Sequence, residues 1–301
     1  MLKRPKKDLI EVFGYSPNDT TQASRSLWNL GACPFLNKPC TKTNHDQSIV
    51  YGTCSVTSPL GNCIICPNRF YEQDFKAIRA VAKDAFGARF KFLTFEQFIP
   101  VRGNKGTCIV ALGHPSGREV KVGQSLSMDW VLAKVQNGIL KEYIGIEVQS
   151  IDITGNYRDC WHTYKNLSPS TQCIPSSEHG MNWANVHKRL IPQIIRKGLV
   201  YSRSDMVKKG LYFIVPEVVY RKFEEVIGSD IPTIEHSGKH TLTVHTYELS
   251  AQPPRGKQRT LKIKRRLRFE LEEFANRFIS GPNLPSGNDL DDAIKHILGT
   301  A

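Results

Sequence analysis

Three carboxylates and one amide lie within a short stretch of the chain: Glu119, Asp129, Glu147 and Gln149. Residues 128–153 have the pattern of an antiparallel hairpin, so strand pairing brings Asp129 within about one residue of facing Glu147. Side-chain alternation puts Glu147 and Gln149 on one face, and Glu119 lies on the preceding candidate strand. Converging carboxylates repel one another unless a cation joins them, and hard oxygen ligands suit Mg²⁺. The stretch is either a Mg²⁺ site that assists phosphodiester hydrolysis or a solvated strand face with unrelated charges.

Five of the eight cysteines fall within 34 positions: Cys33, Cys40, Cys54, Cys63 and Cys66. Thiolates bind zinc or iron tetrahedrally, and four of them can fold a segment that has no core of its own. Cys63 and Cys66 have metal-ligand spacing, but five thiols compete for four positions. The alternative is that some are ordinary buried cysteines. This ligand set does not distinguish iron from zinc.

The chain is strongly basic, with 41 Lys and Arg against 28 Asp and Glu, which gives a formal charge of 41 − 28 = +13. A charge of this size favours a polyanionic partner, with nucleic acid first. Residues 255–268 interleave basic and apolar side chains, so one strand face could contact DNA phosphates while the other packs. A solvated face is the alternative. The candidate DNA contacts are Tyr157, Arg158, Asn185, Lys188, Arg189, Lys262, Lys264 and Arg266.

The elements that must position these residues are mixed helices and strands. Helical spacing marks residues 75–86, ending near Gly87, and the Asn137-Gly138 dipeptide is a strong signal for a hairpin turn. Strands are expected at 107–112, 118–122, 128–135, 143–153, 211–215, 241–249 and 261–269, and further helices at about 186–195, 216–226, 271–279 and 290–298. Residues 155–180 read as a polar loop. We expect an α/β fold whose central mixed sheet is flanked by helices.

The first 70 residues lack clear periodicity and are rich in Gly, Pro, Asn, Ser and Thr. A chain of this kind needs a bound metal or another cross-link to hold its fold. We therefore expect a thiolate metal-binding domain over residues 1–70 and a second domain over residues 71–301. No apolar run reaches the length of a signal peptide or of a membrane span of about 18 residues. We therefore expect a soluble intracellular protein with no membrane partner.

A series of short motifs runs from Cys33 to Leu199. They are Cys33-Pro-Phe35, Cys40-Thr-Lys42, Cys54-Ser-Val56, Cys66-Pro-Asn-Arg69, Asp129-Trp-Val-Leu-Ala-Lys-Val135, Glu147-Val-Gln-Ser-Ile-Asp152 with Gly155 and Tyr157, Asn182 and Asn185-Val-His-Lys-Arg189. In kind and order these motifs resemble the NotI-like type II restriction endonucleases of the PD-(D/E)XK superfamily.

The resemblance implies a homodimeric, cytoplasmic bacterial enzyme that cuts double-stranded DNA at a short GC-rich palindrome. It implies a PD-(D/E)XK core with a small N-terminal metal domain. Structural iron, or zinc as the alternative, would be held by Cys33, Cys40, Cys54 and Cys66, without Cys63. A cognate DNA methyltransferase is implied as a functional partner, with no direct binding expected.

The resemblance also assigns the active site. Asp129 and Glu147 would bind catalytic Mg²⁺, Glu119 would assist or take a second metal, and Gln149 would position the nucleophile. Gln149 stands where most of the superfamily has Lys, and an amide is neither a general base nor a cation. The alternative hypothesis is a non-catalytic DNA-binding regulator whose fold is held by a metal. This hypothesis gives the three carboxylates no function.

Overall fold

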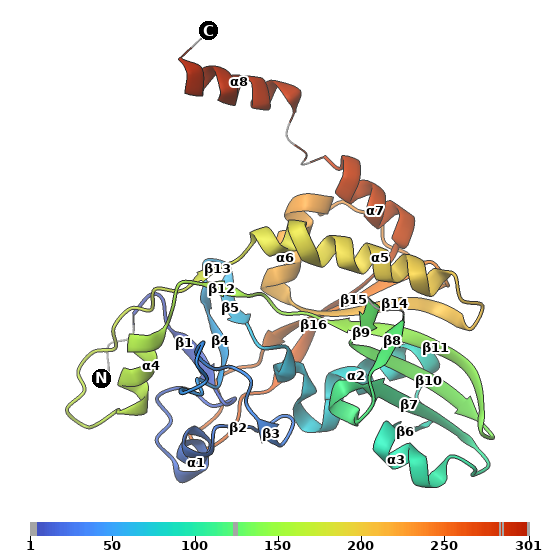
Figure 1. The fold of residues 1–301 in the computed structure, drawn as a ribbon, viewed down its shortest axis with the longest axis horizontal. Coiled ribbons are helices and arrows are strands. Elements are labelled where there is room, and N and C mark those ends of the chain that lie inside the picture. The colour runs from blue at the N-terminus through green and yellow to red at the C-terminus, as the bar shows by residue number, and fades with distance from the viewer. Residues whose placement is uncertain (1–4, 123–125, 283, 285, 300–301) are drawn as a thin grey trace.

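The computed structural model describes residues 5–122, 126–282, 284 and 286–299, and its centre is a seven-stranded sheet (Figure 1). The strand order is β16-β15-β14-β11-β10-β7-β6. β6 pairs with β7, β11 with β14 and β14 with β15 in parallel, and the remaining pairs are antiparallel. Its strands are β6 (Lys91–Thr94), β7 (Thr107–Gly113), β10 (Trp130–Gln136), β11 (Ile139–Val148), β14 (Val207–Pro216), β15 (Thr241–Leu249) and β16 (Leu261–Glu270).

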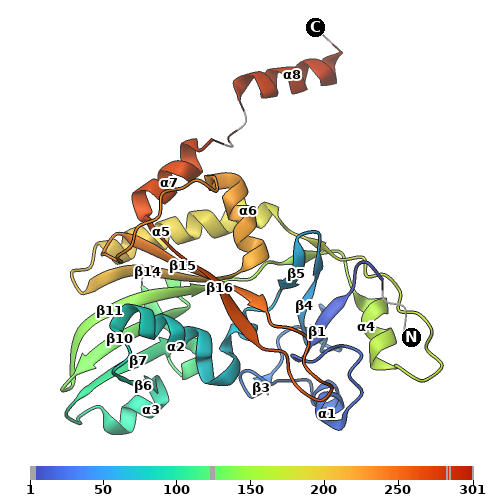
Figure 2. The ribbon, with the colours of Figure 1, turned by 180° about the vertical axis from the view of Figure 1, so that it is seen from behind.

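Helices cover both faces of this sheet (Figures 1 and 2). On one face α2 (Glu72–Phe86) packs Ile78 and Val81 into a cluster with Trp130 and Ile146. The opposite face carries α5 (Ile191–Ser202), α6 (Glu217–Ile227) and α7 (Leu271–Ser280) over a second cluster. The expected α/β architecture, a mixed sheet between helices, is confirmed.

The remaining elements are short or lie outside the central sheet. A two-stranded ribbon, β8 (Val120–Val122) with β9 (Leu126–Met128), precedes β10. The others are α1 (Gln22–Leu30), β2 (Ala32–Cys33), β3 (Lys38–Pro39), α3 (Phe95–Phe98), β12 (Ile153–Thr154), β13 (Gly180–Met181) and α8 (Gly287–Leu298), with 3-10 turns at Pro67–Tyr71, Ile99–Val101 and His114–Ser116.

The first 70 residues contain more regular structure than their pattern indicates. β1 (Leu9–Val12), β4 (Thr53–Ser58) and β5 (Gly61–Ile64) form a three-stranded sheet. Its apolar residues Leu9 and Val56 are buried in the same cluster as the residues of α5 and α6. The sequence of these strands does not alternate between apolar and polar residues, because Glu11 and Ser55 are polar yet completely buried. The expected boundary at residue 70 stays a prediction.

The sequence pattern predicts a polar loop over residues 155–180. The structure differs, because α4 (Arg158–Lys165) forms within this segment. Its Cys160, Trp161 and Tyr164 are buried. With Tyr157 these residues recur at helical spacing, so the signal was present but short. The expected helix at 186–195 begins as a single π-helical turn, Val186–Leu190, and continues as α5.

The hairpin at the centre of the sheet forms as expected. Asn137 and Gly138 both have positive φ, 52° and 77°, which the turn requires and which these two residue types tolerate. β11 ends at Val148 rather than near residue 153. The chain leaves the sheet after Gln149, whose backbone N–H donates to Ile214 O at 3.0 Å.

The C-terminal α8 projects away from the body in both views (Figures 1 and 2). Among the described residues, no helix is long and apolar enough to span a membrane.

Candidate active site and thiol cluster

The two strands of the hairpin bring Asp129 and Glu147 together. Trp130 pairs with Ile146, so Asp129, one residue earlier, comes beside Glu147. The Asp129 Oδ2 accepts a hydrogen bond from Val148 N–H at 2.9 Å. The sequence therefore located this carboxylate pair correctly to within one residue.

The surroundings of the pair disfavour the charged form of both carboxyl groups. Glu147 is only 2% exposed, and burial together with the charge of Asp129 raises its pKa to about 8. Burial also raises the pKa of Asp129, against the hydrogen bond from Val148 N–H. Within the part of the chain that the structure describes, Glu147 Oε1 is buried and has no hydrogen-bond partner. A buried and a partly buried carboxylate that converge in this way fit a hard divalent cation.

Glu119 lies close enough for its charge to raise the pKa of Asp129. It precedes β8, and its own carboxylate accepts a hydrogen bond from Ser127 Oγ and lies 3.4 Å from Lys121 Nζ. Those contacts lower the pKa of Glu119, the Ser127 bond most. Glu119 is therefore a charged neighbour of the pair on a more exposed segment.

Lys197 was not among the residues that the sequence indicated. Its Nζ forms an ion pair with Glu147 Oε2, although 50 positions separate the two residues. Lys197 continues the buried stripe of α5, three positions after Ile194 and four before Tyr201. A lysine at an apolar-stripe position is the signal that could have identified it.

Gln149, two positions after Glu147, lines a pocket of about 310 Å³ whose lining includes neither Asp129 nor Glu147. Asn185, Arg189 and Asp152 line the same pocket, as does Lys42 from the segment that follows Cys40. Asn185 Nδ2 donates to Asp152 Oδ2 at 3.1 Å. Two expected DNA contacts, Asn185 and Arg189, thus lie beside an expected active-site residue.

Tyr157, Arg158 and Lys188 occupy different surroundings. Tyr157 is 8% exposed, and its ring packs edge-on against Tyr51 at 5.2 Å between centroids, a position typical of core packing rather than of a DNA contact. Arg158 and Lys188 are exposed. These two remain available to a surface-bound polyanion.

The basic strand β16 does not present one continuous basic face. A register shift between the pairs Thr246–Arg265 and Tyr247–Ile263 leaves Lys264 as an extra residue. Because paired residues share a face, this bulge puts Lys262 and Arg266 on opposite faces of the sheet. The expected single DNA-facing side of this strand is therefore wrong.

Lys262 and Lys264 also have an acidic neighbour. Both amines approach Glu248 Oε1, at 2.9 and 3.6 Å, and both side chains remain about half exposed. Arg266 is exposed as well. Their role as DNA contacts stays a prediction.

Three of the expected thiol ligands lie in loops whose backbone N–H groups point at the sulfur. The Sγ of Cys33 accepts from Phe35 and Leu36, and that of Cys66 accepts from Asn68. Cys40 Sγ likewise accepts from Lys42 and Gly52. Such bonds stabilise the negatively charged thiolate, which is the form that binds metal.

The four expected ligands are also electrostatic neighbours. Burial, and then the charges of Cys66 and Cys40 among others, raise the pKa of Cys54, and burial raises that of Cys66 to about 11 despite Lys42. The charges of Cys40 and Cys33 act on Cys66 in the same direction. The raised pKa of Cys63 has burial as its cause, and its Sγ approaches Ile64 O at 3.7 Å.

Among the residues that the structure describes, no three Cys, His, Asp or Glu side chains are close enough to form a metal site as they stand. The donor chemistry nevertheless fits a thiophilic metal, since four neighbouring thiols include three with backbone N–H donors. Tyr71 lies near both centres, since the charges of Asp129, Cys66 and Glu147 all raise its pKa, after burial.

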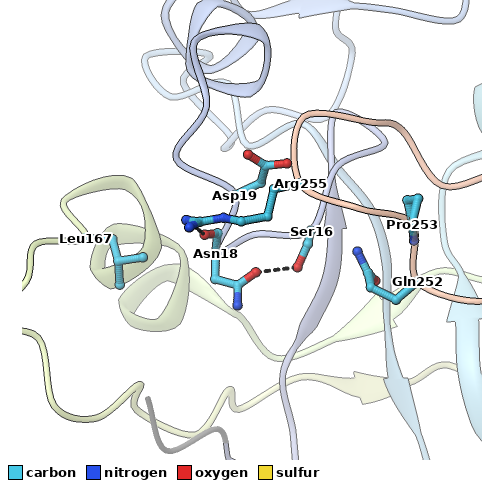
Figure 3. Close-up of a pocket in the computed structure, with 7 residues that line it drawn as sticks. All are labelled: Ser16, Asn18, Asp19, Leu167, Gln252, Pro253 and Arg255. Atoms are coloured by element: carbon cyan, nitrogen blue, oxygen red, sulfur yellow. Dashed lines mark hydrogen bonds between the residues drawn. The ribbon is translucent and has the colours of Figure 1, made fainter. Parts of the chain in front are cut away.

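A larger pocket, of about 630 Å³, lies between the N-terminal segment and the loop before β16 (Figure 3). Arg255 Nη2 donates to Thr20 Oγ1 at 2.9 Å, and Ser16 Oγ donates to Asn18 Oδ1 at 2.6 Å. Its lining contains none of the four expected active-site residues. The larger cavity is therefore separate from the carboxylate pair.

Comparison with known proteins identifies one family. A family model described as "Restriction endonuclease NotI" matches residues 20–226. The match spans the cysteine cluster, the carboxylate pair and Lys197. No curated protein matches the chain.

Proposed function

Because the chain belongs to the NotI restriction endonuclease family, we propose that it is a type II enzyme making Mg²⁺-dependent double-strand breaks at a short GC-rich palindrome. The observation that carries the proposal is the pairing of the partly buried Asp129, just before β10, with the buried Glu147 on β11, in a basic protein. A regulator that only binds DNA has no need for a buried glutamate beside a second carboxylate, an arrangement that costs stability unless a cation joins the two.

Asp129 and Glu147 are the residues that would hold Mg²⁺, and the bound ion would supply charge stabilisation at the scissile phosphate and an activated water. Val148 N–H fixes one oxygen of Asp129, at 2.9 Å. Glu147 is buried on β11, which keeps bulk water from screening its carboxylate, and Asp129 beside it is partly buried. Gln149, two positions after Glu147, would orient a water or a phosphate oxygen through its amide.

Cys33, Cys40, Cys54 and Cys66 are the residues that would hold a structural iron, with zinc as the alternative. The bound metal would tie separate loops of the N-terminal segment together. Support comes from the N–H groups directed at three of these sulfurs and from the electrostatic coupling among the four.

Cleavage of both strands of a palindrome needs two active sites related by a two-fold axis, so we propose a homodimer acting on double-stranded DNA. The enzyme would act in the bacterial cytoplasm. A cognate methyltransferase would protect the host's copies of the site by modifying DNA, without binding this protein.

Incubation of purified protein with phage DNA, with Mg²⁺ and separately with chelator, tests the proposal. We expect discrete fragments with Mg²⁺ only, and sequencing of their ends gives the site. Specific DNA binding with no cleavage in any divalent cation would favour the regulator. Nicking by one chain per duplex, measured by light scattering of the complex, would contradict the dimer.

A further inference from the structure

Lys197, on helix α5, contributes a positive charge to the carboxylate pair. Lys197 Nζ is paired with Glu147 Oε2, and the lysine side chain is only 12% exposed. Across the described ranges, no other Lys or Arg forms an ion pair with Asp129 or Glu147. Gln149, which follows on the hairpin strand, carries no charge.

Because of this contact, the two carboxylate oxygens of Glu147 have different surroundings. Oε2 is occupied by Lys197, whereas Oε1 is buried and, within the described residues, has no hydrogen-bond partner, and Asp129 is the charged neighbour of this carboxylate. A carboxylate held at one oxygen cannot rotate freely, so the other oxygen keeps a fixed direction. The contact therefore leaves one oxygen directed and available as a ligand.

The helix that carries Lys197 is itself held in place. Tyr201, one turn later on α5, packs where Gly145 of β11 has no side chain, and a Cβ at Gly145 would overlap its ring. Tyr201 is buried, and the charges of Glu147 and Asp129 raise the pKa of its hydroxyl after burial. The face of α5 that bears Lys197 thus lies over the carboxylate pair, and rigid elements position functional groups better than loops do.

We propose that Lys197 is a positioning residue of the nuclease site, which holds Glu147 by one oxygen and supplies the positive charge that Gln149 does not. The inference rests on the proposed function, since it assigns Glu147 to a catalytic cation. Removing the ammonium should therefore have opposite effects on two quantities. Cation binding should not weaken, because a competing positive charge is gone, while cleavage should slow, because the ligand oxygen is no longer directed.

The test compares wild type with Lys197→Met in two assays. Calorimetric titration of Ca²⁺ into the protein measures cation affinity without cleavage. Single-turnover cleavage at saturating Mg²⁺ measures chemistry. We expect Ca²⁺ affinity equal to or higher than wild type, and a cleavage rate lower by about 100-fold or more, the scale of losing one preorganised active-site group.

Lys134→Met is the matched control, because Lys134 also pairs with a glutamate of the hairpin, Glu142 at 2.7 Å, away from the site. It should leave both quantities unchanged. Lys197→Arg keeps the charge and should recover at least part of the rate. Circular dichroism accompanies each variant, and Lys197→Gln replaces Lys197→Met under the same criteria if the latter unfolds.

The outcomes separate the two proposals. Near wild-type cleavage by Lys197→Met, or a parallel fall in Ca²⁺ affinity, cleavage and melting temperature, overturns the role of Lys197 while leaving the nuclease intact. Absence of Mg²⁺-dependent cleavage by wild type contradicts the proposed function instead. In that case the Ca²⁺ titration still reports whether Lys197 competes for the carboxylates.

Discussion

The guanidinium of Arg69 lies over the ring of Phe35, with 4.7 Å between its Cζ and the ring centroid. Phe35 follows Cys33 and Arg69 follows Cys66, so the contact joins two of the proposed metal loops. Arg69 is completely buried and pairs with Glu11 at 3.1 Å and Glu72 at 2.6 Å. One side chain thus connects the cysteine loops to β1 and to the start of α2.

Replacement of Arg69 should be strongly destabilising. Arg69→Met leaves two carboxylates, Glu11 and Glu72, buried without a counter-charge, which typically costs about 3–5 kcal/mol. Arg79→Met is the control, because Arg79 also lies over an aromatic ring, Phe92, and pairs with Asp74, but is 37% exposed. Its cost should stay below about 1 kcal/mol. Urea unfolding of both variants measures the difference, and equal costs would contradict a structural role for Arg69.

Cysteine-to-serine variants of the protein should fall into two groups that differ in metal content. Serine at Cys33, Cys40, Cys54 or Cys66 removes a proposed ligand and should lower metal content and solubility, whereas Cys63→Ser should retain the metal. Elemental analysis measures this, and visible absorption of a ferric thiolate distinguishes iron from zinc. Full metal in Cys54→Ser, or loss in Cys63→Ser, would overturn the ligand assignment.

Glycine is required at position 145. Gly145→Ala places a Cβ within the Tyr201 ring, so α5 must shift away from β11 and move Lys197 relative to Glu147. We expect a loss of about 1–3 kcal/mol from overpacking, with slower cleavage. Gly103→Ala is the control, since its added Cβ meets nothing within 4 Å. Thermal melts and cleavage rates that match for the two variants would argue against this packing.

The stability of the metal-free protein should depend on Glu147 with a definite sign. Its folded pKa of about 8 lies above its ordinary value of 4.5, so the stabilisation is complete below pH 4.5 and is lost as the pH rises through 8. Glu147→Gln carries no such titration. Its melting temperature relative to wild type should therefore increase between pH 5 and pH 8.5, by roughly 2–6 °C.

Calorimetry in the presence of chelator measures this shift. Glu142→Gln, which also removes a lysine-paired carboxylate from β11, is the control for the loss of an ion pair. A difference between Glu147→Gln and wild type that does not change with pH would show that burial does not perturb Glu147.

The sequence predicted those parts of the site that depend on local pattern. Asp129 and Glu147 could be paired because the turn at Asn137-Gly138 sets the register between them. Lys197 could not be found in this way, because its contact with Glu147 depends on how α5 packs across the sheet. The faces of β16 were also beyond the sequence, since a single unpaired residue, Lys264, carries no compositional signal.

That unpaired residue makes the positions of strand β16 unequal in their tolerance of deletion. Leu261 and Ile263 pack on the α2 face, and Lys264 interrupts the alternation between them and Arg266. Deleting Lys264 would remove the bulge and leave Ile263 opposite Tyr247 and Arg265 opposite Thr246, so these side chains would keep their faces. Substitutions along this strand change one side chain at a time, whereas deletion of a paired residue would move the residues on one side of it to the other face of the sheet. Natural variation here should therefore include many changes of residue type and, away from Lys264, few changes of residue number.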